Sequence, residues 1–423
     1  MPRYTAPRGT LDVLPQDQPY WRYVTERAHH IARLYGFEQI STPIFETTEL
    51  FVRGVGEGTD IVDKEIYNFQ DKGGEEIALR PEFTAGIMRA FIEHGMHTWP
   101  KPVKLYSIGP IFRYERPQAG RYRQHHQFNV EALGEQDPAL DAEIMEVVHH
   151  LYADLGFGDI AFQINSTGCP QCRPGYVRLL VEYYRGHIDQ LCDDCKRRLT
   201  RNPLRMLDCK ADQCQPLIAG APHFVDHLCR ECAEHFATLQ SYLSALGRSF
   251  TVNHRLVRGL DYYTKTVFEA WAEGIGAQSA VCGGGRYDGL IELLGGPPTP
   301  GIGFGSGIER IILTMKAQEI AVPTLPHPNV LIAPLGSEAK RRAVTLLADM
   351  RAADVAALLS FGDRSLKAQL RTADRQKIRY VVVLGQDELH NAQAVVKDMV
   401  NGGEQYNVPL NALIAWIRER AIS

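Results

Sequence analysis

The sequence predicts an α+β unit, in which an antiparallel sheet is flanked by helices, followed by a separate α/β domain. Three observations predict this. A long hairpin pattern spans residues 108–134, a cysteine-rich segment of helical periodicity spans 166–249, and strands alternate with helices after a proline-rich linker at 323–328. At 423 residues, the chain is long enough for two or three domains with their own cores.

Composition and charge exclude few classes of protein. The chain is 44% hydrophobic and 23% charged, which gives no sign of disorder. No apolar run approaches the length of a membrane span and residues 1–5 lack an apolar leader core, so we expect a cytoplasmic protein without a membrane partner. Residues 329–423 carry 13 Lys and Arg against 10 Asp and Glu, whereas the whole chain has net charge −4. A mildly basic C-terminal unit fits contact with a nucleic acid.

The N-terminal part contains helix and strand patterns in alternation. Periodicity predicts a helix over 17–35 and a strand over 37–40. A second helix is expected from Phe83 to His94. Glu82 and Thr84 stand at its start, where a carboxylate and a hydroxyl ordinarily serve as capping groups.

The hairpin carries the strongest chemical signal. Its first strand begins at Ile108, Pro and Gly mark the turn at 116–121, and the strand 127–133 returns. A helix over 138–155 and a strand over 160–164 are expected after it. Charged residues flank the turn, namely Arg113, Glu115, Arg116, Arg121 and Arg123. Guanidinium groups bind phosphate bidentately, so this group suits a nucleoside triphosphate or an RNA end; a solvated charged hairpin is the alternative.

Eight of the nine cysteines lie in close pairs inside the segment 166–249. The pairs are Cys169 and Cys172, Cys192 and Cys195, Cys209 and Cys214, and Cys229 and Cys232. Disulfides are rare in the cytoplasm, whereas such spacing lets both thiolates of a pair reach one tetrahedral ion. We predict structural zinc in one or two four-thiolate sites. The combination of the pairs stays open, and small buried cysteines are the alternative. The ninth, Cys282, is assigned to packing.

The hairpin resembles motif 2 of the class II aminoacyl-tRNA synthetases, which has a Phe-Arg-x-Glu strand like Phe112–Glu115. The sequence of residues 109–128 is similar to the corresponding segment of the histidyl-tRNA synthetase family. Three other stretches extend this resemblance: Val257–Thr264 and Cys282–Leu290 look like the family's histidine-specific signatures, and Pro300–Arg310 looks like motif 3.

The resemblance covers nearly the whole chain and implies its organisation. The first helix, the first strand and Pro43 are similar to motif 1, which in the family forms a dimer interface. The resemblance implies a catalytic domain in two parts, 1–165 and 250–322, with an insertion of the bacterial type at 166–249. The linker 323–328 and an anticodon-binding domain at 329–423 follow.

The resemblance also implies a reaction, its substrates and the residues that serve it. A homodimer would join L-histidine to AMP using ATP, with Mg²⁺ beside the phosphates, and transfer histidyl to tRNA(His). Arg113 and Arg258 would contact the α-phosphate, Arg310 the γ-phosphate and Glu115 the adenine side. The histidine pocket would contain Glu82, Thr84, Gln127, Glu131, Tyr262, Tyr263 and Tyr287. Arg116 and Gln118 in the hairpin loop would face the acceptor end of the tRNA.

One alternative comes from the same fold. A histidine-binding regulatory paralogue of ATP phosphoribosyltransferase would share the fold, but such paralogues typically lose the signature at 258–263, the motif arginines and the anticodon domain. This chain has all three. The sequence therefore favours the ligase.

Overall fold

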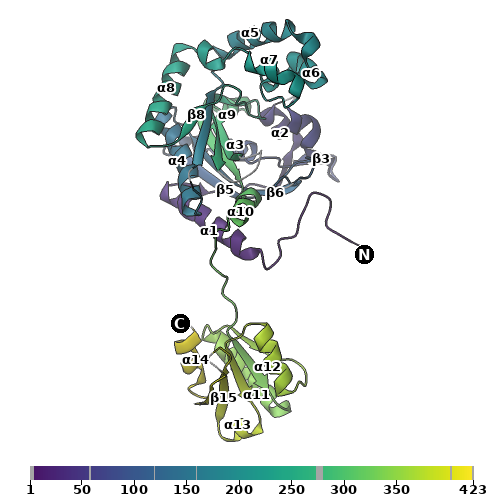
Figure 1. Cartoon of the computed structure of the whole chain (residues 1–423), viewed down its shortest axis with the longest axis vertical. Helices are drawn as coiled ribbons and strands as arrows, with labels where there is room; N and C mark the ends of the chain where they lie inside the picture. The colour runs from purple at the N-terminus through teal and green to yellow at the C-terminus, as the bar shows by residue number, and fades with distance from the viewer. Residues whose placement is uncertain are drawn as a thin grey trace. The chain divides into compact units, whose positions relative to one another are not determined.

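The computed structural model describes residues 4–56, 59–118, 120–158, 160–272, 280–400 and 403–421. The chain divides into two compact units, residues 1–323 and 324–423 (Figure 1). Within the part of the chain that the structure describes, no helix combines the length and apolar character needed to cross a bilayer. Ala119 in the predicted hairpin turn lies outside the described residues.

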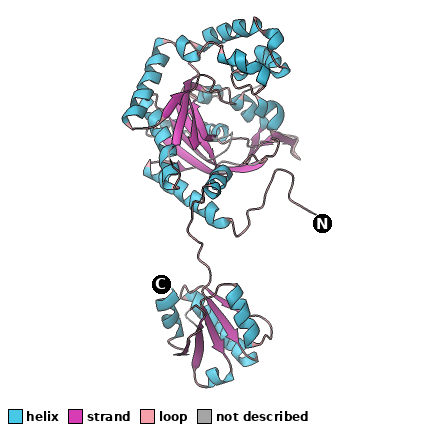
Figure 2. Ribbon diagram, in the orientation of Figure 1, coloured by secondary structure: helices cyan, strands magenta, loops and turns pink. Residues whose placement is uncertain are grey.

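The first unit is built on an eight-stranded sheet in the order β1-β5-β6-β11-β10-β9-β7-β8 (Figure 2). The strands are β1 (Glu38–Gln39), β5 (Val103–Phe112), β6 (Gln124–Leu133), β7 (Ile160–Ser166), β8 (Phe250–Val252), β9 (Thr264–Ala272), β10 (Ala280–Arg286) and β11 (Gly301–Gly307). The six central strands pair antiparallel, as predicted, and the two edge strands pair parallel. Parallel neighbours need a long crossover, and the segment 166–249 provides one between β7 and β8.

The predicted hairpin is longer than the sequence indicated. Its strands β5 and β6 pair from Val103 opposite Leu133 to Phe112 opposite Gln124. The first strand therefore starts five residues before Ile108. The early residues Val103 and Leu105 are buried, so packing extends the strand through a stretch whose Lys and Ser residues weaken its apolar pattern.

One face of the sheet packs on helices and forms the main core. The period of two along β6 turns Phe128, Val130 and Ala132 to this face, where they meet α1 (Gln18–Leu34), α4 (Pro138–Asp154) and α10 (Ile308–Ala317). The bounds of α1 and α4 agree with the predicted helices to within one residue. Cys282 is buried in this core, which confirms its assignment to packing.

The opposite face carries shorter elements. They are α2 (Thr48–Val55), α3 (Thr84–Glu93), α9 (Leu290–Leu293) and a small antiparallel sheet, β2 (Phe45–Thr47), β3 (Tyr67–Gln70) and β4 (Glu76–Leu79). Phe83, which precedes α3, is 2% exposed, and the Arg80 guanidinium lies 4.2 Å from its ring centroid. The helix predicted at this point is confirmed, with α3 beginning one residue later.

The cysteine-rich segment is mostly helical, as predicted. It contains α5 (Arg173–Arg185), α6 (Asp193–Arg201), α7 (Gln215–Ala219) and α8 (Arg230–Ala245). The first three enclose a small core of their own, whereas α8 packs on α4 and contributes Phe236, Leu239 and Leu243 to the main core. His235 of α8 also lies 2.9 Å from the buried Asp141 carboxylate, which pairs with the buried Arg286.

Single helical turns complete the first unit. They are a π-helical turn at Ile61–Glu65 and 3₁₀ turns at Met96–Thr98, Ile188–Gln190, Pro203–Met206, Asp212–Cys214 and Phe224–His227.

The second unit is an α/β domain with a five-stranded mixed sheet in the order β13-β12-β14-β15-β16. The strands are β12 (Val330–Pro334), β13 (Ala357–Leu359), β14 (Tyr380–Leu384), β15 (Gln393–Asp398) and β16 (Gln405–Pro409); the helices are α11 (Ser337–Ala352), α12 (Leu366–Arg375), α13 (Gln386–His390) and α14 (Leu413–Ala421). β13 begins two residues later than the apolar run predicts. The Val355 N–H donates instead to Met350 O (2.9 Å), which closes the end of α11.

Candidate active site

The open face of the large sheet is lined with glycine where it would otherwise carry side chains. Residues directly opposite one another on neighbouring antiparallel strands share a face, and two such rows cross the four central strands. One row is Glu131, Gly303, Gly285 and Val267. The next row is Asn129, Gly305, Gly283 and Glu269. The result is a shallow floor with acidic groups at its two sides.

The glycines leave room that side chains from other elements fill. A Cβ at Gly303 would lie 2.0 Å from Glu131 Oε2, and a Cβ at Gly283 would lie 2.4 Å from an Arg258 guanidinium nitrogen. Contacts this short do not occur, so a larger residue at Gly283 would displace the Arg258 guanidinium, and one at Gly303 would also meet the backbone oxygen of Val130 at 2.3 Å. The signatures at 282–290 and 300–310 therefore share one physical function, which is to let Arg258 and Glu131 lie flat on the sheet.

Glu131 is the centre of a buried hydrogen-bonded group. Its side chain is enclosed, with Thr84 Oγ1 donating to Oε1 at 2.6 Å and the Tyr287 hydroxyl donating to Oε2. Burial raises the pKa of Glu131 to about 8, against the lowering effect of these two hydrogen bonds. A buried carboxylate with hydroxyl neighbours can accept an N–H from a small polar ligand.

Glu82 serves as a cap and also faces the same group. Its carboxylate accepts the backbone N–H groups of Thr84 and Ala85, the latter at 2.8 Å, so the ordinary capping role is real. Glu82 and Glu131 interact electrostatically, and burial raises the pKa of Glu82. Two carboxylates therefore stand together at the start of α3.

The predicted tyrosines gather beside these carboxylates. The Tyr262 ring packs on Tyr263 with centroids 4.8 Å apart and on Tyr287 at 5.6 Å. Tyr287 contacts Glu131 directly, whereas Tyr263 interacts with the Arg258 guanidinium. The structure thus brings Thr84, Glu131 and the three tyrosines into one enclosure. Gln127 lies farther along β6, opposite Gly307.

A cationic group continues from the tyrosines along the glycine floor. Arg258 pairs with Glu269, and Glu269 also interacts electrostatically with Arg310. Arg310 donates to Ala280 O (2.5 Å), and burial lowers its pKa, with nearby Arg121 adding to the effect. Glu269 therefore pairs with Arg258 and also acts electrostatically on Arg310.

The hairpin brings the third predicted arginine to the same area. Arg113 Nε donates to Pro81 O (2.8 Å), and its charge acts on Glu82. Its guanidinium lies 4.0 Å from Glu115, and that of Arg121 lies 3.8 Å from the same carboxylate. Arg116 and Gln118 are exposed on the loop. The hairpin accordingly presents inward-facing and outward-facing polar groups.

Three contributors to this site were missed by the sequence analysis. Glu269 lies on β9 opposite Gly283, which places it on the glycine face. Glu309 accepts the His126 backbone N–H (2.9 and 2.8 Å) and thereby fixes the start of α10 against β6. Arg80 Nε donates to Pro110 O (2.8 Å) beneath the hairpin. Alternation along β9 could have indicated Glu269; the other two depend on contacts between distant segments.

The eight clustered cysteines lie apart from these groups, in the insertion. They form two groups, Cys169 with Cys172, Cys229 and Cys232, and Cys192 with Cys195, Cys209 and Cys214. Within each group the sulfur atoms all lie within 4.8 Å of one another. Each group has the number and type of ligand atoms for a tetrahedral zinc ion.

An antiparallel sheet that holds arginines over a glycine-lined face, next to a buried carboxylate and a long hairpin, defines the catalytic domain of a class II aminoacyl-tRNA synthetase. The family model described as Histidyl-tRNA synthetase matches residues 9–170 and 210–311, and the model described as Anticodon binding domain matches 329–420.

Known proteins match over the full length. The histidine–tRNA ligase of Dehalococcoides mccartyi is 51% identical over 417 residues, which cover 99% of this chain and 100% of that protein. The histidine–tRNA ligase of Desulforamulus reducens is 50% identical, with coverage of 98% and 99%. The crystal structure of apo histidyl-tRNA synthetase from S. aureus has a TM-score of 0.82 at 38% identity, with coverage of 98% and 99%. The chain belongs to the histidyl-tRNA synthetase family.

Proposed function

We propose that this protein is an ATP-dependent histidine–tRNA ligase that forms histidyl-adenylate and transfers the histidyl group to the 3′ end of tRNA(His). One observation carries the proposal. The enclosure around Glu131 and the ion pair of Arg258 with Glu269 lie on one glycine-lined face, so an amino acid and a nucleotide can meet there. The full-length identity to histidine–tRNA ligases supports the same reaction.

In the first step, a carboxylate oxygen of histidine attacks the α-phosphorus of ATP, and the bond to pyrophosphate breaks as pyrophosphate leaves. No nucleophilic side chain is required, since the barrier falls through positioning and charge neutralisation. Arg113 and Arg258 would neutralise the α-phosphate and Arg310 the γ-phosphate, while Glu115 would contact the adenine side. ATP enters as its magnesium complex, whose ion offsets charge on the β- and γ-phosphates.

Selectivity for histidine would come from hydrogen bonds to both imidazole nitrogens. Glu131 and Tyr263 are proposed for these contacts, with Tyr262 and Tyr287 closing the pocket. Glu82, Thr84 and Gln127 are proposed to hold the α-amino group, and they complete the proposed pocket. A site that leaves buried polar groups unpaired rejects an analogue by roughly 10⁴-fold, so editing is unnecessary.

In the second step, a hydroxyl of the terminal ribose attacks the carbonyl carbon of the adenylate, and AMP leaves. The exposed loop residues Arg116 and Gln118 are proposed to contact the acceptor end. Residues 329–420 match the anticodon-binding model, and we propose that this unit binds the anticodon of tRNA(His).

We also propose a cytoplasmic homodimer. Leu34, Ile44 and Phe45 are 56%, 43% and 54% exposed, and all lie in or next to the segment that resembles motif 1. Exposed large apolar residues in this segment suit burial against a second copy. Sedimentation at micromolar concentration would report a dimer, and a Phe45→Glu variant should shift it toward monomer.

Histidine-dependent exchange of radiolabelled pyrophosphate into ATP tests the proposal. We expect exchange with histidine and none with the other standard amino acids, followed by charging of a tRNA(His) transcript. A regulatory paralogue would bind histidine but support neither reaction. Histidine binding without exchange would therefore overturn the proposed function in favour of that alternative.

A further inference from the structure

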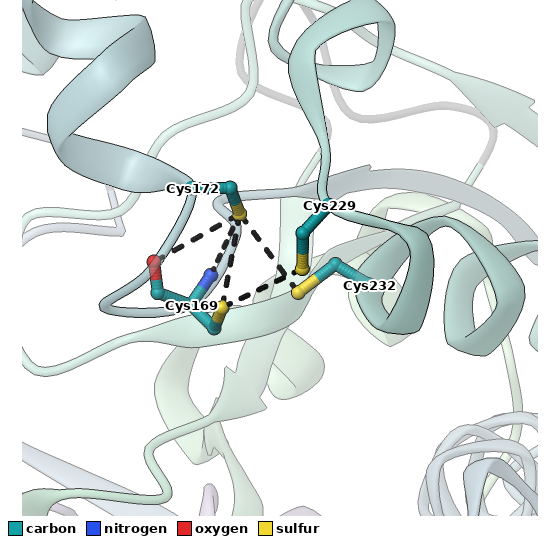
Figure 3. Close-up of side chains that lie close together, drawn as sticks. All are labelled: Cys169, Cys172, Cys229 and Cys232. Carbon is teal, nitrogen blue, oxygen red and sulfur yellow. Dashed lines mark hydrogen bonds between the residues drawn. The ribbon is translucent and has the colours of Figure 1, made fainter.

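The structure shows which cysteine pairs belong together, a question that sequence spacing left open. One group lies within the other along the chain. The first cluster, Cys169, Cys172, Cys229 and Cys232, joins the two ends of the insertion (Figure 3). The second cluster, Cys192, Cys195, Cys209 and Cys214, lies inside it. The first cluster therefore closes the base of the insertion next to β7 and β9, whereas the second closes only an inner loop.

The sulfur spacing fits one ion per cluster. In the first cluster, Cys169 Sγ lies 3.8 Å from Cys172 Sγ and 3.7 Å from Cys229 Sγ, and Cys172 Sγ lies 3.9 Å from Cys232 Sγ. Zinc–sulfur bonds of about 2.3 Å in a tetrahedron place the sulfurs about 3.8 Å apart. Disulfide sulfurs are only about 2.05 Å apart. A four-iron cluster binds each thiolate through a different iron atom and would hold the thiolates farther apart.

The second cluster repeats this spacing and shows how the thiolates are stabilised. Its Cys192 and Cys209 sulfurs lie 3.7 Å apart. The backbone N–H of Cys195 donates to Cys192 Sγ, and that of Ala211 donates to Cys209 Sγ, both at 3.4 Å. Cys192 is also the N-cap of α6, where the helix dipole favours negative charge. Small buried hydrophobes would have no use for such donors.

The first cluster lies at two helix starts and beside two cations. Cys172 is the N-cap of α5 and Cys229 is the N-cap of α8. Arg173 interacts electrostatically with Cys169, Cys172 and Cys232, and Lys265 interacts with Cys232. Two positive charges would offset the net charge of about −2 that four thiolates leave on zinc.

We propose that each cluster is a structural zinc site with four thiolates, and that the zinc of the first cluster holds the loop that positions Tyr263. The metal sites stand independently of the reaction. The consequence for histidine binding rests on the proposed function.

The contacts from the first cluster to the loop are direct. Arg173, which follows Cys172, donates to Thr167 O (3.0 Å) and to the carbonyl oxygen of Tyr263. Lys265 donates its backbone N–H to Gly168 O, and Thr167 donates to Lys265 O, both at 2.8 Å. Backbone hydrogen bonds therefore join the segment between β7 and Cys169 to Lys265, near Tyr263 in the chain.

Local backbone geometry supports the same connection. Lys265 has φ of 50°, a left-handed conformation that side chains rarely adopt, and its ammonium donates to Glu231 (2.8 Å) between Cys229 and Cys232. Gly168 has φ of 63°, and a Cβ there would lie 2.7 Å from Cys172 Sγ. Both conformations are held by neighbours of the first cluster, so loss of its ion should release them.

The second cluster reaches the same loop less directly, because Val257 packs against the core that contains Cys195, Cys209 and Cys214, and a hydrogen bond joins the loop to the far end of α6. There Asn202 donates to Asp261 at 2.6 Å, a helix length away from Cys192 and Cys195. Its loss should chiefly affect the insertion's own core. This contrast separates the two sites.

Elemental analysis of the full-length protein, purified under reducing conditions without chelator, tests the metal sites. We expect two zinc ions per chain, one in Cys232→Ser, one in Cys195→Ser and two in the matched control Cys282→Ala, whose thiol lies outside both clusters. Because variants can misfold, the unmodified protein provides a second measurement: a mercurial reagent should release one zinc for every four thiols titrated. Iron in place of zinc, or no metal with eight freely reacting thiols, would overturn the proposal.

Hydrogen exchange tests the connection to Tyr263 without relying on activity. We expect residues 258–266 to lose protection in Cys232→Ser and to change little in Cys195→Ser. Arg173→Gln should loosen the same residues while both zinc ions stay bound, since it removes the link and leaves the ligands. The KM for histidine should rise about 10-fold in Cys232→Ser and Arg173→Gln. Unchanged protection in Cys232→Ser that has lost one zinc would overturn the coupling, whereas inactivity of the unmodified protein would overturn only the proposed function.

Discussion

Arg258 is a charged group that the fold prepares but does not fully satisfy. Its guanidinium pairs with Glu269, yet its Nε is buried without a hydrogen-bond partner among the described residues. An unmet buried donor costs about 1–3 kcal/mol. Such a donor is well suited to an oxygen of a bound phosphate, where its hydrogen bond would be made only when substrate is present.

Replacing Arg258 by Ala should therefore slow chemistry more than it weakens histidine binding. Loss of one preorganised charge contact lowers the rate by about 10²–10³-fold. Pyrophosphate exchange measures the rate, and calorimetric titration measures histidine binding. Arg258→Lys is the matched control, since it keeps the charge but loses the planar fork. Its exchange rate should fall between those of the unmodified protein and Arg258→Ala. Near-normal exchange in Arg258→Ala would remove this residue from the catalytic group.

Glu131 should make the stability of the ligand-free protein depend on pH. Burial raises its folded-state pKa to about 8, above the ordinary value of 4.5. Between these values the folded state binds more protons than the unfolded state, so stability falls as pH rises from about 4.5 to about 8. Glu131→Gln lacks this titration. Melting temperatures should show the unmodified protein losing stability relative to Glu131→Gln across this range, and parallel profiles would contradict the assignment.

At the scale of elements, the central strands β11 and β10 contribute to the site through missing side chains. A Cβ at Gly303 would lie 2.3 Å from Val130 O as well as 2.0 Å from Glu131 Oε2. Both atoms are anchored, one in the sheet and the other by Thr84 and Tyr287. The strand therefore cannot accept a larger residue without moving its neighbour.

Gly303→Ala is expected to destabilise the protein by about 1–3 kcal/mol, the usual cost of overpacking, and to abolish measurable histidine binding. Chemical denaturation and calorimetry check the two parts. Gly289→Ala is the matched control, because a Cβ there meets no atom within 4 Å. If Gly303→Ala bound histidine as well as Gly289→Ala does, the glycine floor would have no role in forming the pocket.

At the scale of the molecule, the two units have separate cores. The sheet of residues 324–423 packs on its own helices α11 and α14, and the large sheet packs on α1, α4 and α10. All the residues assigned to adenylation lie in the first unit. Activation and tRNA binding should therefore be separable.

A truncated chain of residues 1–323 should retain histidine-dependent pyrophosphate exchange and lose tRNA charging. Removing one of two linked binding modules lowers apparent affinity by about 10²-fold or more. Charging of tRNA(His) at increasing concentration measures the loss, and exchange measured on the same preparation is the internal control. Charging at the rate of the full chain would show that the second unit is dispensable for tRNA binding.

The sequence by itself determined the class of fold and the order of the elements, because those features depend on local information. Hydrophobic periodicity predicted α1 and α4, and turn residues predicted the hairpin. The motifs at 257–264, 282–290 and 300–310 identified the family. It also predicted metal in the insertion, although not the combination of the cysteine pairs.

The tertiary structure decided everything that depends on residues meeting across the chain. It joined Cys169 to Cys229 across the insertion, paired Glu269 with Arg258, and made Tyr287 a direct partner of Glu131. Strand register determines these meetings, because it sets which glycine lies under which side chain. Register comes from packing of both sheet faces at once, and no local stretch of sequence contains it.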